Sequence, residues 1–160
     1  MHFQILTHKM DPGPHDARDM GLPIAITGSS VDAIELMYDV LSARGYRPWI
    51  VWNSTYEHPP LSMATKAHAR LLTYTARAYA AECQILMLRR VVDSMNADHA
   101  WTLDADLVTA KDIPAPFDMT DDADVLLGLG YSRFSRKALE CISRDFGTGL
   151  DYSSLEVRTV

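Results

Sequence analysis

The chain has 160 residues, of which 48% are hydrophobic and 22% charged, a composition that fits one globular domain with a buried core. Its formal net charge of −6 argues against non-specific nucleic-acid binding, which requires cationic side chains to neutralise phosphates. The sequence contains no apolar run of the length that a membrane-spanning helix needs, and its N-terminus does not resemble a signal peptide. We therefore expect a single cytoplasmic domain over residues 1–160.

Two short strands are predicted near the start of the chain, at residues 3–7 and 24–27, separated by a Pro- and Gly-rich loop at 8–23. The second strand runs into the small-residue turn Thr27-Gly28-Ser29-Ser30. Such a turn before a helix exposes backbone N–H groups at a positive helix end, which suits a phosphate or the edge of a nucleoside. Helix capping alone would also account for these residues.

A helix is predicted after this turn, because the apolar residues of segment 31–44 recur at helical spacing and Gly45 follows as a stop signal. Ser29, with Asp32 three residues later, predicts the N-cap. The next strand, at 48–52, ends at Asn53. A strand–helix–strand unit predicts a parallel pair, and ligands of such sheets bind outside the carboxyl ends of the strands.

Residues 62–95 are rich in Ala, Leu and Met and are predicted to be helical throughout, as two helices or one bent helix. Lys66, Arg70, Tyr74 and Arg77 are spaced four, four and three residues apart, so they would share one helix face. Three cations on one helix face could bind a pyrophosphate, and the aromatic ring could stack on a base or sugar. A solvated basic face is the alternative interpretation.

The chemistry is expected to centre on residues 100–106, where a short apolar run ends in Asp104 and Asp106 with Ala105 between them. We interpret the run as a buried strand whose carboxyl end opens into a site. Once the chain leaves the sheet, both carboxylates can point at one hard cation, and the small Ala105 leaves room for a ligand. Ordinary turn or capping residues are the alternative, since Asp is common in both.

The charges are unevenly distributed around this motif. Residues 62–90 contain five Lys or Arg side chains and one Glu, whereas residues 93–124 contain nine Asp and one Lys. A basic segment followed by an acidic one suits a metal ion and an anionic ligand bound between them.

The last third of the chain is predicted to hold one more strand, at 125–129, and a helix at 136–144 capped by Ser135. Residues 121–124 are expected to form a surface turn, Gly128 to Tyr131 a close backbone approach or a bulge, and 147–160 irregular structure. Cys83 and Cys141 are far apart and are each expected in a helix as buried, reduced thiols of a cytoplasmic protein. They form no zinc-binding pattern.

Residues 101–108 (Trp-Thr-Leu-Asp-Ala-Asp-Leu-Val), followed by Lys-Asp-Ile at 111–113, resemble the Asp-x-Asp segment of GT-A-type glycosyltransferases, as in their retaining galactosyltransferase-like members. The resemblance covers about residues 24 to 145 and is most specific over 100–113. It implies an α/β fold of the Rossmann-like nucleotide-diphospho-sugar transferase type, with a mostly parallel central sheet flanked by helices.

The same resemblance implies a metal-dependent hexosyltransferase that moves a sugar from a UDP- or GDP-sugar to a glycan, protein or small-molecule acceptor. Asp104 and Asp106 would hold Mn²⁺ or Mg²⁺ against the donor diphosphate. Thr27 and Asn53 would meet the nucleoside, and Lys66, Arg70 or Arg77 would meet phosphate. Gly28 and Ala105 are also expected to bind the nucleotide-sugar. Family members usually continue into a C-terminal part with an acceptor site, a base and often a His metal ligand. No His follows His99, so the resemblance implies a minimal or truncated member with unassigned catalytic residues.

Two other classes of function remain open from the sequence. One is a non-catalytic module that binds a nucleotide or nucleotide-sugar and acts through a partner. The other is a phosphohydrolase of the haloacid-dehalogenase type, which also carries Asp-x-Asp after a strand. In that class the motif normally follows the first strand with well over a hundred residues after it, whereas 54 follow Asp106.

Overall fold

The computed structural model describes residues 22–113, 117, 122–144 and 153–159. A seven-stranded sheet forms its centre, in the order β3-β2-β1-β4-β6-β5-β7. The strands are β1 (Ile24–Thr27), β2 (Trp49–Asn53), β3 (Leu71–Tyr74), β4 (His99–Asp104), β5 (Val125–Leu127), β6 (Tyr131–Ser135) and β7 (Val157–Thr159). The helices are α3 (Val31–Ala43), α4 (Leu61–Ala67), α5 (Ala80–Met95) and α6 (Arg136–Arg144), with 3-10 turns η1 (His68–Arg70) and η2 (Ala110–Asp112).

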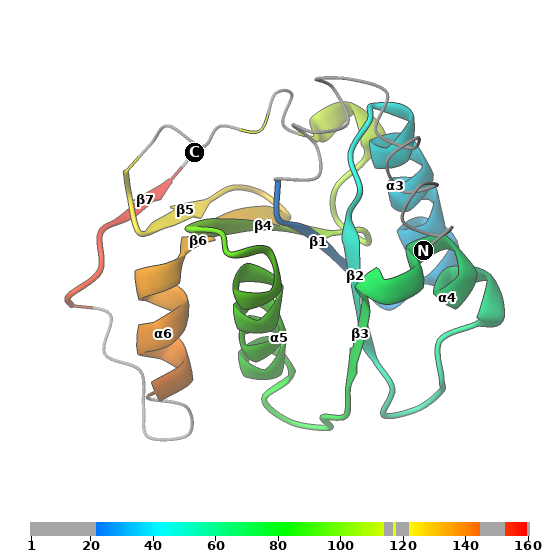
Figure 1. Cartoon of the computed structure of the whole chain (residues 1–160), viewed down its shortest axis with the longest axis horizontal. Helices are drawn as coiled ribbons and strands as arrows, with labels where there is room; N and C mark the ends of the chain where they lie inside the picture. The colour runs from blue at the N-terminus through cyan, green and yellow to red at the C-terminus, as the bar shows by residue number, and fades with distance from the viewer. Residues whose placement is uncertain (1–21, 114–116, 118–121, 145–152, 160) are drawn as a thin grey trace, which may run out of the picture.

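The sheet is mostly parallel, which confirms the predicted fold class. Four strand pairs are parallel, and β6 alone runs antiparallel to its neighbours β4 and β5. Helices α5 and α6 lie on one face of the sheet, and α3 and α4 on the other (Figure 1). None of the described helices has the length and apolar character required to cross a membrane.

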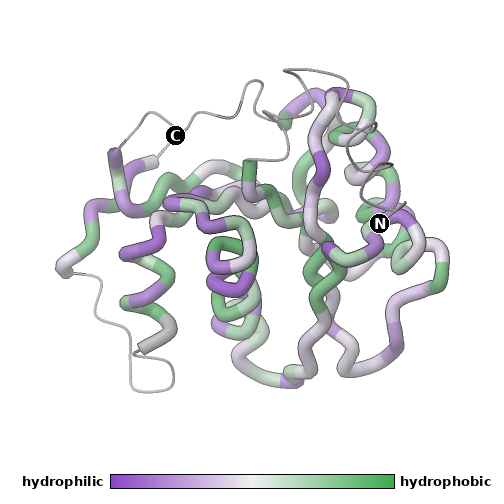
Figure 2. Tube along the Cα trace, in the orientation of Figure 1, coloured by the Kyte–Doolittle hydropathy of each residue, from purple (hydrophilic) through white to green (hydrophobic). Residues whose placement is uncertain are grey.

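Two apolar layers hold the helices to the sheet, because alternate strand residues face opposite sides. On one side, Ile34 and Leu41 of α3 pack with Ile24, Ile26 and Ile50. On the other side, α5 and α6 pack against the alternate strand residues, which face away from α3. This second layer includes strand residues Ala25, Val51 and Ala100 and helix residues Leu88, Val92 and Leu139. Figure 2 shows the largely apolar central strands, and helices α5 and α6 alternating between hydrophilic and hydrophobic residues.

The β1–α3–β2 unit confirms the predicted strand, helix and parallel strand, although the helix N-cap is Ser30 rather than Ser29. The Ser30 side chain accepts a hydrogen bond from the Ala33 N–H, whereas Ser29 turns its hydroxyl toward Asp106. Cys83 and Cys141 lie in α5 and α6 as predicted, and neither forms a disulfide within the described residues. Ser135 caps α6 as predicted. The strand predicted at 3–7 lies outside the described residues.

The prediction of continuous helix over 62–95 is wrong. Helix α4 ends at Ala67, and residues 71–74 form strand β3, which pairs in parallel with β2. Backbone hydrogen bonds to β2 outweigh the modest helix propensity of these four residues. The predicted shared helix face therefore does not exist: Lys66 lies in α4, Arg70 in η1, Tyr74 in β3 and Arg77 in the following loop.

Two further strands were missed in the C-terminal third. Strand β6 contains Arg133, which is fully buried and donates a hydrogen bond from its guanidinium to the Ala123 carbonyl. A charged residue at a buried position interrupts the alternation of apolar and polar residues that predicts a strand, so β6 was not recognised. Strand β7 lies within the stretch expected to be irregular and has three exposed residues. The surface turn predicted at 121–124 is wrong at Ala123, which is buried. Asp121 lies outside the described residues.

Candidate functional site

The carboxyl ends of β1, β2, β3 and β4 meet at one edge of the sheet, where ligands of parallel sheets commonly bind. The strand register pairs Thr27 with Asp104, and Asn53 with Tyr74. The Thr27 side chain is buried and its hydroxyl donates to the Leu103 carbonyl. This edge therefore offers mainly Asp104, Asp106 and the backbone of the turn at 27–30.

Asp104 and Asp106 are linked directly. One carboxylate oxygen of Asp104, Oδ1, accepts the Asp106 N–H at 2.9 Å, so the chain turns tightly as it leaves β4. Asp104 is half-buried and Asp106 exposed. Ala105 is buried in the apolar layer under α3, and its N–H donates to the Thr27 carbonyl at 2.8 Å. Its small side chain therefore fills the space beneath the turn.

The Asp106 carboxylate is bound to the start of α3. It accepts hydrogen bonds from the Ser29 N–H and the Ser29 hydroxyl, both at 2.8 Å, and from the Ser30 N–H at 3.2 Å. Desolvation raises the pKa of Asp106, but these three hydrogen bonds outweigh it and lower the pKa below its usual value. The second carboxylate of the motif thus joins β4 to the turn after β1.

Gly28 allows this close approach. Its φ of +152° is unfavourable for other residues, and a Cβ there would lie 3.3 Å from both Asp106 Oδ1 and Ile34 Cγ1. A side chain at this position would press against the carboxylate and the first turn of α3. The glycine keeps the backbone of the turn accessible beside the two acidic residues.

Replacing Asp106 with Ala is expected to lower the free energy of unfolding at pH 7 by about 1 kcal/mol. Three hydrogen bonds are lost, but each contributes little because the carboxylate is exposed to solvent. Because folding lowers the pKa of Asp106, the ionised carboxylate stabilises the fold fully at pH values above the ordinary pKa of 3.8. This stabilisation is lost as the pH falls through the lower pKa of the folded state. Urea unfolding at pH 7 and at successively lower pH should show the difference between wild type and variant shrinking below 3.8. A difference that is independent of pH would contradict the hydrogen-bonded carboxylate.

Asn53 lies at the predicted edge, but its side chain is engaged in local structure. Its Oδ1 accepts the Thr55 N–H at 3.0 Å and the Thr55 hydroxyl, and its Nδ2 donates to the Ala76 carbonyl at 3.1 Å. Asn53 therefore ties the loop after β2 to the loop after β3 and shapes the edge rather than presenting a free amide.

The predicted phosphate-binding cations do not lie together in the structure. Lys66 pairs with Asp39 at 2.9 Å, and Arg70 donates to the Arg47 carbonyl and lies 5.4 Å from the centroid of the Trp49 ring. Trp49 begins β2, so Arg70 lies at the amino edge, opposite the acidic pair.

Arg77 follows the carboxyl end of β3, on the acidic edge. It is exposed and forms no hydrogen bond or ion pair within the described part of the chain. Of the three predicted cations, Arg77 alone follows the carboxyl end of a strand, at the edge of the sheet that carries Asp104 and Asp106.

Comparison with known proteins supports the fold. The sequence matches no family model and no curated protein. A crystal structure from Desulfovibrio desulfuricans G20, of a protein provisionally assigned as a nucleotide-diphospho-sugar transferase, is similar with a TM-score of 0.55 and 10% sequence identity. The similarity covers 86% of this chain and 79% of that chain. At this identity, the similarity shows a shared α/β architecture.

Proposed function

We propose that this chain is a metal-dependent glycosyltransferase that uses a UDP- or GDP-sugar donor. The observation that carries the proposal is the Asp104 carboxylate at the carboxyl edge of a parallel sheet, beside the turn that follows Thr27, with an oxygen that accepts no hydrogen bond from the described residues. The fold is similar to that of a protein provisionally assigned as a nucleotide-diphospho-sugar transferase, which supports the same chemistry.

The acidic pair has the ligand chemistry of a Mg²⁺ or Mn²⁺ site. Hard divalent cations prefer carboxylate oxygens, and Mg²⁺ typically binds one or two carboxylates together with substrate phosphates. Asp104 Oδ2 accepts no hydrogen bond from the described residues, so it is available as a ligand. No cluster of three or more His, Cys, Asp or Glu with metal-binding geometry occurs within residues 22–113, 117, 122–144 and 153–159. Donor phosphate oxygens and water would therefore complete the coordination shell.

The chain's own residues would bind and orient the donor. The backbone at Gly28 allows a nucleoside to approach beside Thr27, and the loop held by Asn53 borders the same edge. Arg77 would neutralise part of the diphosphate charge as an exposed cation on that edge. A bound divalent cation would supply charge neutralisation for the leaving diphosphate.

A non-catalytic nucleotide-binding module is the second candidate. It is favoured by the hydrogen bonds that Asp106 already makes to Ser29 and Ser30, because they give this carboxylate a structural role independent of turnover. The phosphohydrolase hypothesis gains no such support, since the Asp-x-Asp motif follows β4, after three earlier strands.

Titration calorimetry with UDP, GDP, UDP-sugars and GDP-sugars, with and without Mn²⁺, tests the proposal. We expect saturable binding of one nucleotide family that depends on Mn²⁺ and is abolished by EDTA, together with slow hydrolysis of the matching nucleotide-sugar. Metal-dependent binding without hydrolysis or transfer would favour the non-catalytic module. No binding of any of these nucleotides, with or without Mn²⁺, would refute both functions.

A further inference from the structure

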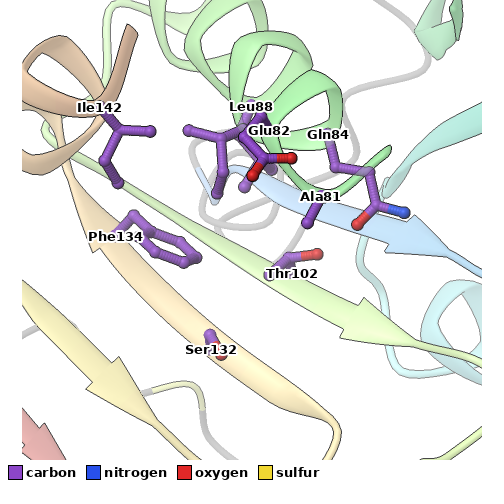
Figure 3. Close-up of a pocket in the computed structure, with 9 residues that line it drawn as sticks. Ala81, Glu82, Gln84, Leu88, Thr102, Ser132, Phe134 and Ile142 are labelled. Carbon is purple, nitrogen blue, oxygen red and sulfur yellow. The ribbon is translucent and has the colours of Figure 1, made fainter. Parts of the chain in front are cut away.

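A pocket of about 260 Å³ lies between the first turns of α5, the last turns of α6 and the sheet strands β4 and β6. Figure 3 shows its lining side chains, with Phe134 and Ile142 on one side and the start of α5 on the other. The volume is somewhat below the roughly 300–1,000 Å³ of sites for drug-sized ligands. The pocket therefore suits a single small ring.

The pocket combines an apolar wall with hydroxyl groups. Leu88 and Ile142 are almost fully buried, and the half-buried Phe134 ring offers a flat apolar surface. Thr102 and Ser132 are direct partners in the β4–β6 register and both line the pocket. Their hydroxyls make no hydrogen bond within the described residues, although both side chains are half-buried. Two adjacent unpaired hydroxyls beside an aromatic ring favour a ligand with both C–H and O–H surfaces.

The polar residues of the α5 wall restrict the charge of such a ligand. Glu82 and Gln84, in the first turns of α5, also line the pocket. The Glu82 carboxylate would repel an anion, whereas it can accept a hydrogen bond from a neutral hydroxyl. A phosphate group is therefore disfavoured in the pocket, and an uncharged polyhydroxylated ring is favoured.

The pocket is close to the acidic pair but separate from it. Thr102 and Asp104 are two residues apart on β4, a spacing that places their Cα atoms about 7 Å apart and turns their side chains to the same face. None of the residues implied in donor binding lines the pocket. A ring that contacts Thr102 would therefore lie on the face of the sheet to which the Asp104 side chain turns.

We propose that this pocket binds the acceptor, as a single neutral sugar ring whose hydroxyls bond to Thr102 and Ser132 and whose apolar face lies against Phe134. The assignment as an acceptor subsite depends on the proposed glycosyltransferase function, whereas the binding of a neutral sugar ring does not. The donor diphosphate would be excluded from it by Glu82 and held at the acidic pair.

The test is an NMR titration of the ¹⁵N-labelled chain with the methyl glycosides of glucose, galactose and mannose, and with cyclohexanol as a ring of similar size with one hydroxyl. We expect saturable shifts at Thr102 and Ser132 with at least one glycoside, and weaker binding of cyclohexanol. Thr102→Val and Ser132→Ala should each weaken the glycoside about five- to tenfold, the effect of one lost hydrogen bond. Thr73→Val, the same change at an exposed position of β3, is the matched control and should leave binding unchanged.

The proposal is overturned if no glycoside binds, if cyclohexanol binds as tightly, or if the two hydroxyl deletions leave the affinity unchanged. Titration of the wild-type chain with UDP and with GDP, in the presence of Mn²⁺, separates the two proposals. Nucleotide binding without glycoside binding would refute the acceptor pocket and leave the donor site intact. Glycoside binding without any nucleotide binding would support the sugar pocket and refute the transferase function.

Discussion

Replacing Asp104 with Asn is expected to lower the Mn²⁺-dependent affinity for the nucleotide diphosphate by at least about 100-fold. Substitution of a residue that only hydrogen-bonds to a metal ligand typically lowers metal affinity or activity about 10–100-fold. The loss of a direct anionic ligand should lower the affinity at least as much. The amide oxygen of Asn can still accept the Asp106 N–H, which Asp104 Oδ1 accepts at 2.9 Å in the wild type. The free energy of unfolding should therefore change by no more than about 1 kcal/mol.

Calorimetric titration of UDP and GDP with and without Mn²⁺ measures the loss, and urea unfolding measures the stability. Asp112→Asn is the matched control, because it removes the same charge from an exposed position eight residues later that is bonded locally to Thr109. Unchanged nucleotide affinity in Asp104→Asn, accompanied by a large loss of stability, would assign Asp104 a structural role and remove it from the metal site.

The parts of the fold that the sequence predicted well are those with a strong local pattern. The helical spacing of apolar residues in 31–44 and the apolar runs of β1, β2 and β4 are visible without knowing the neighbouring elements. The parallel pairing of β1 with β2 follows from the helix between them. The edge that carries Asp104 could be inferred for the same reason.

Strand β3 could not be inferred in this way, because Leu71–Tyr74 lies in a stretch of good helix formers. Its conformation depends on backbone hydrogen bonds to β2, a contact that the local composition does not reveal. Because of this single error, Lys66 and Arg70 were predicted on one helix face with Arg77, which the structure does not show. Their actual partners, Asp39 and the Arg47 carbonyl, are more than twenty residues earlier.

The candidate site shows the same limit. The sequence identified Asp104 and Asp106 as a pair, but not the bond from Asp106 to Ser29, 77 residues away. The capping pattern at Ser29 was a misleading signal, because this hydroxyl bonds to Asp106 and Ser30 caps the helix instead. The pocket beside Thr102 was also missed, since its lining comes from α5, α6, β4 and β6 and has no linear motif.

Replacing Gly130 with Ala is expected to destabilise the fold by about 2–4 kcal/mol. Gly130 has a φ of +77°, and an added Cβ would lie 2.6 Å from Val108 Cγ2 and 2.9 Å from Leu107 Cβ. The unfavourable φ costs a residue with a Cβ about 1–3 kcal/mol, and the close contacts of the added methyl group cost a similar amount. Movement of the turn would relieve part of this cost. The Gly130 carbonyl accepts the Asp104 N–H at 2.8 Å, so this movement would also disturb the end of β4.

Urea unfolding at pH 7 measures the stability loss, and the UDP titration with Mn²⁺ measures its consequence at the acidic pair. Leu129→Ala is the matched control in the same turn, because Leu129 is 87% exposed and its truncation should change stability by no more than about 0.5 kcal/mol. A Gly130→Ala protein as stable as the wild type would show that the turn does not pack against Leu107 and Val108. A destabilised variant that is still folded at low temperature should bind nucleotide more weakly, because the turn between β5 and β6 would no longer hold Asp104 in place.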